Sequence, residues 1–475
     1  MGRTDRLERI ALVPVLVVVA ARTVLELAVA GRYGWHRDEL YYAVAGRHLQ
    51  GGYVEFPPVT GLLSATAHAL FGWSLTGFRL FTILAGGGVT VLAALVAREL
   101  GGRRRSQLLA AVLVGLSPIL IVTNGLFQPV SFDQLTTMAL LWLALRLALG
   151  RGSWPAIGAV AGVGLETKYT LAVVLVLLLA GFLAWRRDVL FSRGFVLATA
   201  IAALLMIPNF AWEAMHGWVS VHWFLHPPPS ASDESRPGYL VTLLLETTPV
   251  AFPVAVAGMV SLLRDRLVRP LGLAAAGTPV AYFLLGGKSY YAGPAMLFAL
   301  AAGAGPLERW LTRPRAWAFG IAFGVFFLAL LPVEMPVLPL HTADRAGIIA
   351  GRSDFEAELA WPTLVRDVER QAKGADVVIA SNYGEAGALD LFGHGLPPVA
   401  TGDVTFRYWR PMVKGRNALL VGFSSPPAGI CSAFHVLDRF RIAVHNDEQG
   451  APIARCTLTR PLGDAWPALV ATYPG

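Results

Sequence analysis

Long apolar segments recur along the first 333 residues, and this feature most constrains the fold. A helix needs roughly 20 mostly apolar residues to cross a bilayer, and only 15% of this chain is charged, against about 25% in a typical soluble domain. The pattern predicts about 11 membrane-spanning helices in an α-helical polytopic membrane protein. The predicted spans are 8–30, 76–97, 107–123, 131–148, 154–166, 168–185, 194–212, 239–262, 270–286, 290–308 and 316–333.

The basic residues predict how these spans are oriented. With the N-terminus in the cytoplasm, six cytoplasmic segments hold eighteen Lys and Arg residues, and the opposite loops before residue 334 hold seven. This asymmetry is the positive-inside pattern of a cytoplasmic-membrane protein. The formal charge of +8 is thereby explained by topology, and no nucleic-acid partner is expected.

The composition changes at about residue 334 to that of a soluble domain. We therefore predict two domains, a transmembrane domain at 1–333 with an outer loop at 31–75, and a small extracytoplasmic α/β domain at 334–475. Ser353 begins a capping-box pattern for a helix to about Lys373, and short β-rich runs follow it. These runs are 376–380, 418–423, 441–445 and 453–458. The sequence leaves open whether Cys431 and Cys456, both in this domain, form a disulfide.

The outer loop 31–75 is longer than a connector requires and rich in aromatic residues. Its adjacent carboxylates, Asp38 and Glu39, lie just inside a predicted helix start and point to different faces. A carboxylate favoured by the helix dipole is the structural alternative for Asp38. Within the first span, Arg22 and Glu26 are four residues apart, which favours a simple pair.

Further ionisable or phenolic side chains lie at the outer ends of other spans. Ionisable groups at membrane depth are costly and usually functional, although each one alone is also explained by snorkelling or local pairing. Carboxylates beside cations suit glycosyl transfer from a lipid phosphate, because a base must deprotonate the acceptor hydroxyl and cations must hold the phosphate. These residues are Arg79, Asp133, Lys168, Lys288, Tyr290 and Tyr291.

The motif RDELYYAVAGRHLQGGYVEFPP in the first loop resembles the signature of GT-C superfamily glycosyltransferases. It is most similar to bacterial proteins related to dolichyl-phosphate-mannose–protein mannosyltransferases, which form glycosyltransferase family 39, and to lipid A aminoarabinose transferases. The resemblance continues through FRLFTILAGG, SFDQLTTMALLWLALR, ETKYTLAVV and GKSYYAGPAMLFAL to SNYGEAGALDLFG in the outer domain. It covers nearly the whole chain, and the order of the motifs is more specific than any one of them.

The resemblance implies a catalytic site made of Asp38 as base, Glu39 and Asp133. Donor phosphate contacts would then fall to Arg79, Lys168 and Lys288, with Tyr290 and Tyr291 beside them. Glu55 matches a position that some relatives link to a divalent metal, but Phe56 replaces the Lys that follows it in lipid A transferases. The sequence leaves metal use open and implies no other cofactor.

Two functions remain at this point. The first is transfer of a sugar from a polyprenyl-phosphate lipid to a hydroxyl of a protein, glycolipid or cell-wall polysaccharide on the outer face of the membrane. The second is a transporter or flippase of a lipid-linked or anionic substrate, which places ionisable groups near the bilayer midplane, often in two related halves. Most ionisable groups here are predicted at one face, which favours the transferase. The sugar, the acceptor and the oligomeric state are not specified by the sequence.

Overall fold

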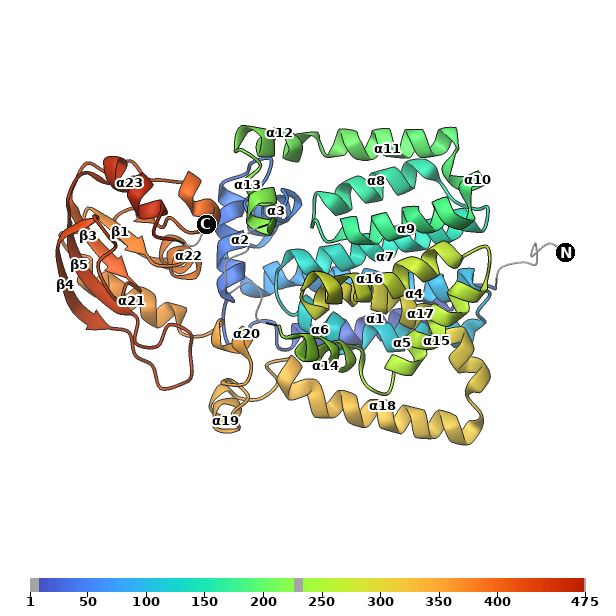
Figure 1. Ribbon diagram of the computed structural model, residues 1–475. Coiled ribbons are helices and arrows are strands. Elements are labelled where there is room, and N and C mark those ends of the chain that lie inside the picture. The colour runs from blue at the N-terminus through green and yellow to red at the C-terminus, as the bar shows by residue number, and fades with distance from the viewer. Residues whose placement is uncertain (1–7, 226–233, 474–475) are drawn as a thin grey trace.

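The computed structural model describes residues 8–225 and 234–473, so the predicted cytoplasmic residues Arg3 and Arg6 lie outside it. A helical bundle and a smaller domain built around a sheet lie side by side (Figure 1). The helices before and within the bundle are α1 (Leu12–Leu27), α2 (Arg37–Arg47), α3 (Val59–Phe71), α4 (Leu75–Glu99), α5 (Arg104–Gly115), α6 (Pro118–Asn124), α7 (Pro129–Ala148), α8 (Trp154–Leu165), α9 (Leu171–Trp185), α10 (Arg187–Leu190), α11 (Arg193–Leu205), α12 (Ile207–Met215), α13 (Val219–Leu225), α14 (Arg236–Thr247), α15 (Phe252–Arg264), α16 (Arg269–Leu285), α17 (Gly293–Trp310) and α18 (Arg313–Glu334).

Each predicted span coincides with a helix or with a helix pair of the bundle. By length and apolar composition, two of the described helices, α4 and α18, can cross a membrane unaided. Three bent pairs add candidates: α5 with α6 bent by 53°, α11 with α12 bent by 49°, and α14 with α15 bent by 93°. Helices α3, α8 and α9 are apolar but shorter. The predicted apolar segments are therefore helical, but the helix lengths do not establish the predicted count of eleven spans.

The predicted span 239–262 is wrong as a single straight helix. Its two halves, α14 and α15, are bent by 93° around residues 248–251. Thr248 has a φ of 63° and precedes Pro249. A residue before proline is disfavoured in the α-helical region, and proline itself cannot donate the helical hydrogen bond. The TTPVAFP sequence therefore interrupts the helix although it is apolar enough to continue it.

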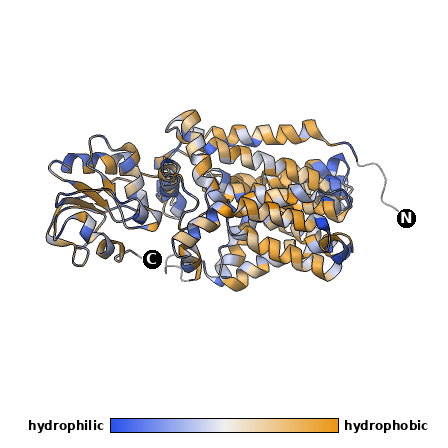
Figure 2. Cartoon of the chain, turned by 90° about the horizontal axis from the view of Figure 1, so that it is seen from above, coloured by the Kyte–Doolittle hydropathy of each residue, from blue (hydrophilic) through white to orange (hydrophobic). Residues whose placement is uncertain are grey.

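The basic segments predicted to be cytoplasmic gather at one end of the bundle. Arg98 donates a hydrogen bond to the carbonyl oxygen of Glu8, and Arg151 pairs with Glu99 at 2.8 Å. Arg186 donates to the carbonyl oxygens of Ala148 and Leu267, which joins two further loops to this end. Hydrophilic residues are concentrated at this end of the bundle, near the N-terminus, while the helices between the ends are mostly apolar (Figure 2).

The sheet of the smaller domain has five strands in the order β2-β1-β3-β5-β4. Strands β2, β1 and β3 are parallel, and β5 and β4 are added antiparallel. Buried side chains alternate between the two faces, as a strand requires: Val378 and Leu419 pack with α21 and α22, while Val377 and Leu420 pack with α23. The elements are α19 (Leu340–Arg345), α20 (Ser353–Glu356), α21 (Trp361–Gln371), β1 (Val377–Ala380), α22 (Tyr383–Phe392), β2 (Val399–Ala400), β3 (Asn417–Val421), β4 (Cys431–Arg439), β5 (Pro452–Leu458) and α23 (Leu462–Val470).

Two predictions for this domain are wrong in detail. The helix expected from Ser353 to Lys373 is divided into α20 and α21, because Ala360 adopts a φ of 76° directly before the Trp361–Pro362 start of α21. The strand expected at 441–445 does not form, and the edge strand next to β5 is β4, which was not predicted. Cys431 of β4 and Cys456 of β5 form a disulfide, with their Cα atoms 5.5 Å apart.

Candidate active site

Asp38 lies in the first turn of α2, on the side of the bundle that faces the sheet domain (Figure 1). His36 precedes the helix as its N-cap, and its Nδ1 accepts a hydrogen bond from the backbone N–H of Asp38 at 3.1 Å. Glu39 completes a capping box by accepting from the backbone N–H of His36 at 2.8 Å. The predicted helix start is thus confirmed. The Asp38 side chain remains 38% exposed, while that of Glu39 is fully buried.

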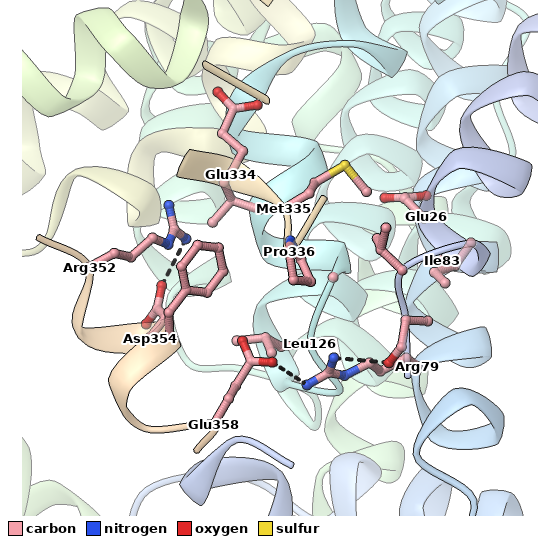
Figure 3. A pocket seen from close by; sticks show the side chains of 15 residues that line it. Glu26, Arg79, Ile83, Leu126, Glu334, Met335, Pro336, Arg352, Asp354 and Glu358 are labelled. Carbon is pink, nitrogen blue, oxygen red and sulfur yellow. Dashed lines mark hydrogen bonds and ion pairs between the residues drawn. The ribbon is translucent and has the colours of Figure 1, made fainter. Parts of the chain in front are cut away.

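Glu39 forms a buried ionic network with Arg79 of α4. Arg79 donates from Nε and from an η nitrogen to the two Glu39 oxygens, at 2.9 and 2.7 Å. It also donates to Glu358, which follows α20, at 3.2 Å (Figure 3). Burial raises the pKa of Glu358 to about 8, with Arg79 acting in the opposite direction. The network joins the first loop, the bundle and the segment leading into the sheet domain.

The structure gives Arg79 a place different from the predicted phosphate contact. Its remaining hydrogen bonds go to the carbonyl oxygens of Ala30 and Gly34, and the residue is 1% exposed. Each guanidinium nitrogen already donates to a protein acceptor, which indicates a structural role for Arg79. Glu39 is committed in the same way, since it also accepts from the backbone N–H of Phe127 at 2.7 Å. Both side chains hold α2 in position.

A small cavity of about 30 Å³ lies beside this network. Its walls include Glu26, Glu334, Arg352 and Asp354 together with Arg79, and Figure 3 shows Arg352 turned toward Asp354. This volume suits a water molecule, which needs roughly 10–15 Å³, but not a lipid phosphate with its sugar. Glu26 is also bonded to Arg22 at 2.6 Å, which confirms the predicted pair within α1.

Asp133 of α7 lies beside the loop between α8 and α9, which carries Lys168. Its carboxylate accepts hydrogen bonds from Thr170 at 3.0 Å and from Thr137 at 3.3 Å, and it interacts electrostatically with Lys168. The Lys168 ammonium lies 5.2 Å from the centre of the Tyr291 ring. The structure therefore brings Asp133, Lys168 and Tyr291 together from three separate segments of the bundle.

Tyr290 and Tyr291 connect this group to the first loop. They belong to a short 3-10 helix, η2 (Ser289–Ala292), and their ring centres are 4.7 Å apart. Tyr42 of α2 interacts electrostatically with Tyr291, and Tyr290 interacts with both Tyr42 and Asp38. Phenolic side chains thus run from Asp38 toward the Asp133 group.

Lys288 precedes these tyrosines and lies near the segment before the sheet domain. It acts electrostatically on Asp354, which is 2.9 Å from Arg352. Although burial opposes the effect, Arg352 and His36 lower the pKa of Asp354 below its usual value. Lys288 therefore faces a carboxylate that stays ionised, a partner that sequence analysis did not indicate.

Glu55 does not have the surroundings of a metal ligand. One oxygen lies 2.5 Å from the Tyr41 hydroxyl and 3.5 Å from the Thr405 hydroxyl, and the other has no partner among the described residues. Burial raises the pKa of Glu55 to about 8, which favours the protonated carboxyl rather than the carboxylate a metal requires. In the described ranges, no group of three His, Cys, Asp or Glu side chains has a geometry that could hold an ion. The residues present around Glu55 do not fit the divalent metal that the resemblance left open.

The sheet domain supplies residues that the sequence did not predict for the site. The Tyr383 hydroxyl donates a hydrogen bond to Asp38 at 2.6 Å. Thr405, in the 3-10 helix η3 (Val404–Tyr408), accepts from the backbone N–H of Val54 at 2.9 Å and lies 2.6 Å from the Tyr41 hydroxyl. Both residues follow the carboxyl ends of parallel strands, β1 and β2, where ligand-binding residues of α/β domains commonly lie. For Tyr383, which follows the predicted run 376–380, this position was the signal available in the sequence.

Known proteins similar to this chain share both its sequence pattern and its fold. The family model of dolichyl-phosphate-mannose-protein mannosyltransferase matches residues 55–212. An undecaprenyl phosphate-alpha-4-amino-4-deoxy-L-arabinose arabinosyl transferase 1 of Pseudomonas fluorescens is 29% identical over 42% of this chain and 41% of its own length. A second transferase of that name, from another strain of the species, is 27% identical over 70% of this chain and 62% of its own length. The chain therefore spans less than two thirds of these relatives in the matched regions.

Among solved structures, ArnT from Cupriavidus metallidurans has the same fold. In its complex with undecaprenyl phosphate it superimposes with a TM-score of 0.63, covering 93% of this chain and 97% of ArnT at 17% identity. The apo form gives a TM-score of 0.64 over 98% of this chain and 99% of ArnT, at 16% identity.

These findings show that the chain has the fold of ArnT. More particularly, the chain is related to the dolichyl-phosphate-mannose–protein mannosyltransferases and to the aminoarabinose transferases.

Proposed function

We propose that this protein is a membrane glycosyltransferase that moves a sugar from a polyprenyl-phosphate donor to an acceptor hydroxyl on the outer face of the cytoplasmic membrane. The observation that carries the proposal is the contrast between two adjacent carboxylates. Asp38 is 38% exposed on its side chain, whereas Glu39 is buried and paired with Arg79. A general base must reach the proton that it removes, and Asp38 satisfies this condition.

In this mechanism, a carboxylate oxygen of Asp38 takes the proton of the acceptor hydroxyl. At the same time, the oxygen of that hydroxyl attacks the anomeric carbon of the donor sugar. The bond between the anomeric carbon and the phosphate oxygen breaks, with inversion, and the polyprenyl phosphate leaves with the bonding electrons. Cations stabilise the charge that develops on the departing phosphate. Lys168 and Lys288, with Tyr290 and Tyr291, are the residues we assign to this contact, and Asp133 positions Lys168.

The relationship to the aminoarabinose transferases supports a polyprenyl-phosphate donor, since undecaprenyl phosphate is named for those proteins and is bound in the ArnT structure. We propose that the basic end of the bundle faces the cytoplasm and the sheet domain lies outside. The candidate acceptors are protein, glycolipid and cell-wall glycan hydroxyls. A transporter or flippase is less well supported, because Arg22 and Glu26, the ionisable pair within α1, are hydrogen-bonded to each other rather than presented to a substrate.

The decisive experiment compares wild-type protein with Asp38→Asn in proteoliposomes that contain a polyprenyl-phosphate sugar. We expect transfer to fall by about a hundredfold to ten-thousandfold while undecaprenyl phosphate still binds, since general base catalysis contributes about 10²–10⁴-fold. Asp464→Asn is the matched control, because this exposed residue of α23 lies in the sheet domain away from the site. Normal turnover by Asp38→Asn refutes the assignment of the base. Lipid movement across the bilayer without transfer identifies a flippase instead. Lipids that accumulate in a deletion strain identify the donor.

A further inference from the structure

The sheet domain is in direct contact with the helix that carries Asp38, and two glycines of α22 permit this contact. A Cβ atom added at Gly384 would lie 2.8 Å from Cβ of Arg37, and one added at Gly387 would lie 2.9 Å from Cβ of Leu40. Both distances are shorter than real Cβ contacts allow, so the helix backbones meet without side chains between them. The three-residue spacing of the glycines places them on one face of α22. The sheet domain is therefore packed against the first loop as part of one site.

Tyr383, the first residue of α22, is held in place from several directions. Asn382 caps the helix by accepting from the backbone N–H of Glu385, and the backbone N–H of Tyr383 donates to Asp403 at 3.1 Å. Burial and the adjacent Asp38 hold the pKa of the Tyr383 hydroxyl well above its usual value. The hydroxyl therefore keeps its proton and serves as a donor, at 2.6 Å from Asp38 Oδ1.

We propose that Tyr383 is a positioning residue for the base, supplied by the sheet domain to complete the active site of the transmembrane domain. This inference rests on the proposed role of Asp38. A hydrogen bond donated to a carboxylate favours its ionised form, and it also fixes the rotation of the carboxyl group. The second oxygen, Oδ2, is then left to accept the acceptor proton.

Other charged and titratable groups also face Asp38, but they are engaged differently. His36 Nδ1 lies 3.9 Å from Asp38 Oδ2 and is occupied as the acceptor of the Asp38 backbone N–H. Arg37 pairs with Asp447 at 3.3 Å. Tyr42 and Tyr290 interact with Asp38 electrostatically. Within residues 8–225 and 234–473, Tyr383 provides the one side-chain hydrogen bond to the Asp38 carboxylate.

The test is Tyr383→Phe in the full-length protein in proteoliposomes, with kcat and KM for the donor measured across pH. We expect the acidic limb of the kcat/KM profile to move upward by about one pH unit, because a hydrogen bond to a charged group is lost. We also expect kcat to fall by about tenfold, with the donor KM changed less than twofold. An unmoved limb with unchanged kcat overturns the proposal.

Tyr473→Phe is the matched control. Its hydroxyl donates a hydrogen bond of the same length, 2.6 Å, to the carbonyl oxygen of Ala380 in β1 of the same domain, and none to Asp38. This variant loses a buried tyrosine hydrogen bond and is expected to leave the acidic limb in place. If it moves the limb as far as Tyr383→Phe does, general loosening of the domain explains the effect and the proposal fails.

A second variant keeps the hydroxyl and therefore the fold. Incorporation of 3-fluorotyrosine at position 383 makes the phenol a stronger donor, so the acidic limb should move to lower pH, opposite to Tyr383→Phe. Movement in the other direction or none overturns the proposal. The two hypotheses are separable: an active Asp38→Asn variant refutes the base, whereas an inactive one combined with an unmoved limb in both Tyr383 variants refutes only the role of Tyr383.

Discussion

Replacement of Arg79 with Met tests whether this residue holds the site together or binds the donor. Arg79 donates hydrogen bonds to Glu39, Glu358 and two backbone carbonyl oxygens, and its side chain is 2% exposed. Removing one member of a buried ion pair leaves its partner uncompensated, which costs about 3–5 kcal/mol. We expect Arg79→Met to lower the free energy of unfolding by that amount, measured by denaturant titration in detergent.

A double-mutant cycle with Glu39→Gln measures how much of this cost belongs to the pair. The residues are joined by two hydrogen bonds, so the double variant should be less destabilised than the sum of the single variants by about 1–3 kcal/mol. Glu358 loses its Arg79 partner in the Arg79→Met variant and in the double variant. The double variant is therefore not expected to reach wild-type stability.

Arg79→Lys separates the two roles directly. A lysine preserves the positive charge that a phosphate contact needs, but it cannot reproduce the planar fork that engages Glu39 and Glu358 together. A structural role therefore predicts a substantial loss of stability in Arg79→Lys, with an undecaprenyl phosphate Kd within about twofold of wild type for the folded fraction. An Arg79→Met variant that unfolds within about 1 kcal/mol of wild type, yet binds the lipid at least tenfold more weakly, refutes the reasoning.

Two further predictions concern donor binding and pH. Lys168→Met and Lys288→Met should each weaken undecaprenyl phosphate binding by about tenfold, as expected for the loss of a charge-assisted hydrogen bond. Lys414→Met, which changes an exposed residue of the sheet domain, is the control. An unchanged Kd in either variant removes that lysine from the phosphate site. Because burial raises the pKa of Glu55 to about 8, the folded state holds a proton that the unfolded state releases. The stability that Glu55 contributes is therefore complete below about pH 4.5 and is lost as pH rises to about 8, with a slope of up to about 1.4 kcal/mol per pH unit. Glu55→Gln should flatten the pH dependence of the unfolding free energy in this window, and a profile identical to wild type contradicts the assignment.

The helical segments of the bundle were predictable because apolar runs and basic loops act locally. The predicted segment 76–97 became α4, and the start of α2 at Arg37 followed from its own capping residues. The bend at Thr248 was missed because hydropathy does not register the backbone restriction that a proline places on the residue before it. The composition change near residue 334 falls where α18 ends, at Glu334.

The site was less predictable because its hydrogen bonds join residues that are far apart in the chain. Tyr383 and Asp38 are separated by 345 positions, and no periodicity carries that information. The sequence showed that Arg79 lies at the outer end of a span, but not that its donors are already occupied there. Burial and pairing of ionisable groups are properties of the assembled fold, so chemical type and membrane depth alone did not indicate the protein partners of Arg79.

The use of two adjacent carboxylates follows from helix geometry. Successive residues on an α-helix are rotated by about 100°, so Asp38 and Glu39 cannot face the same surroundings. Glu39 turns toward α4 and meets Arg79, while Asp38 turns toward α22 and meets Tyr383. The pairing of Glu39 fixes the rotation of α2, and that rotation sets the direction in which Asp38 is presented. Replacement of Glu39 with Gln should therefore lower kcat because Asp38 is presented in a less favourable direction. Asp38 should remain the base in that variant.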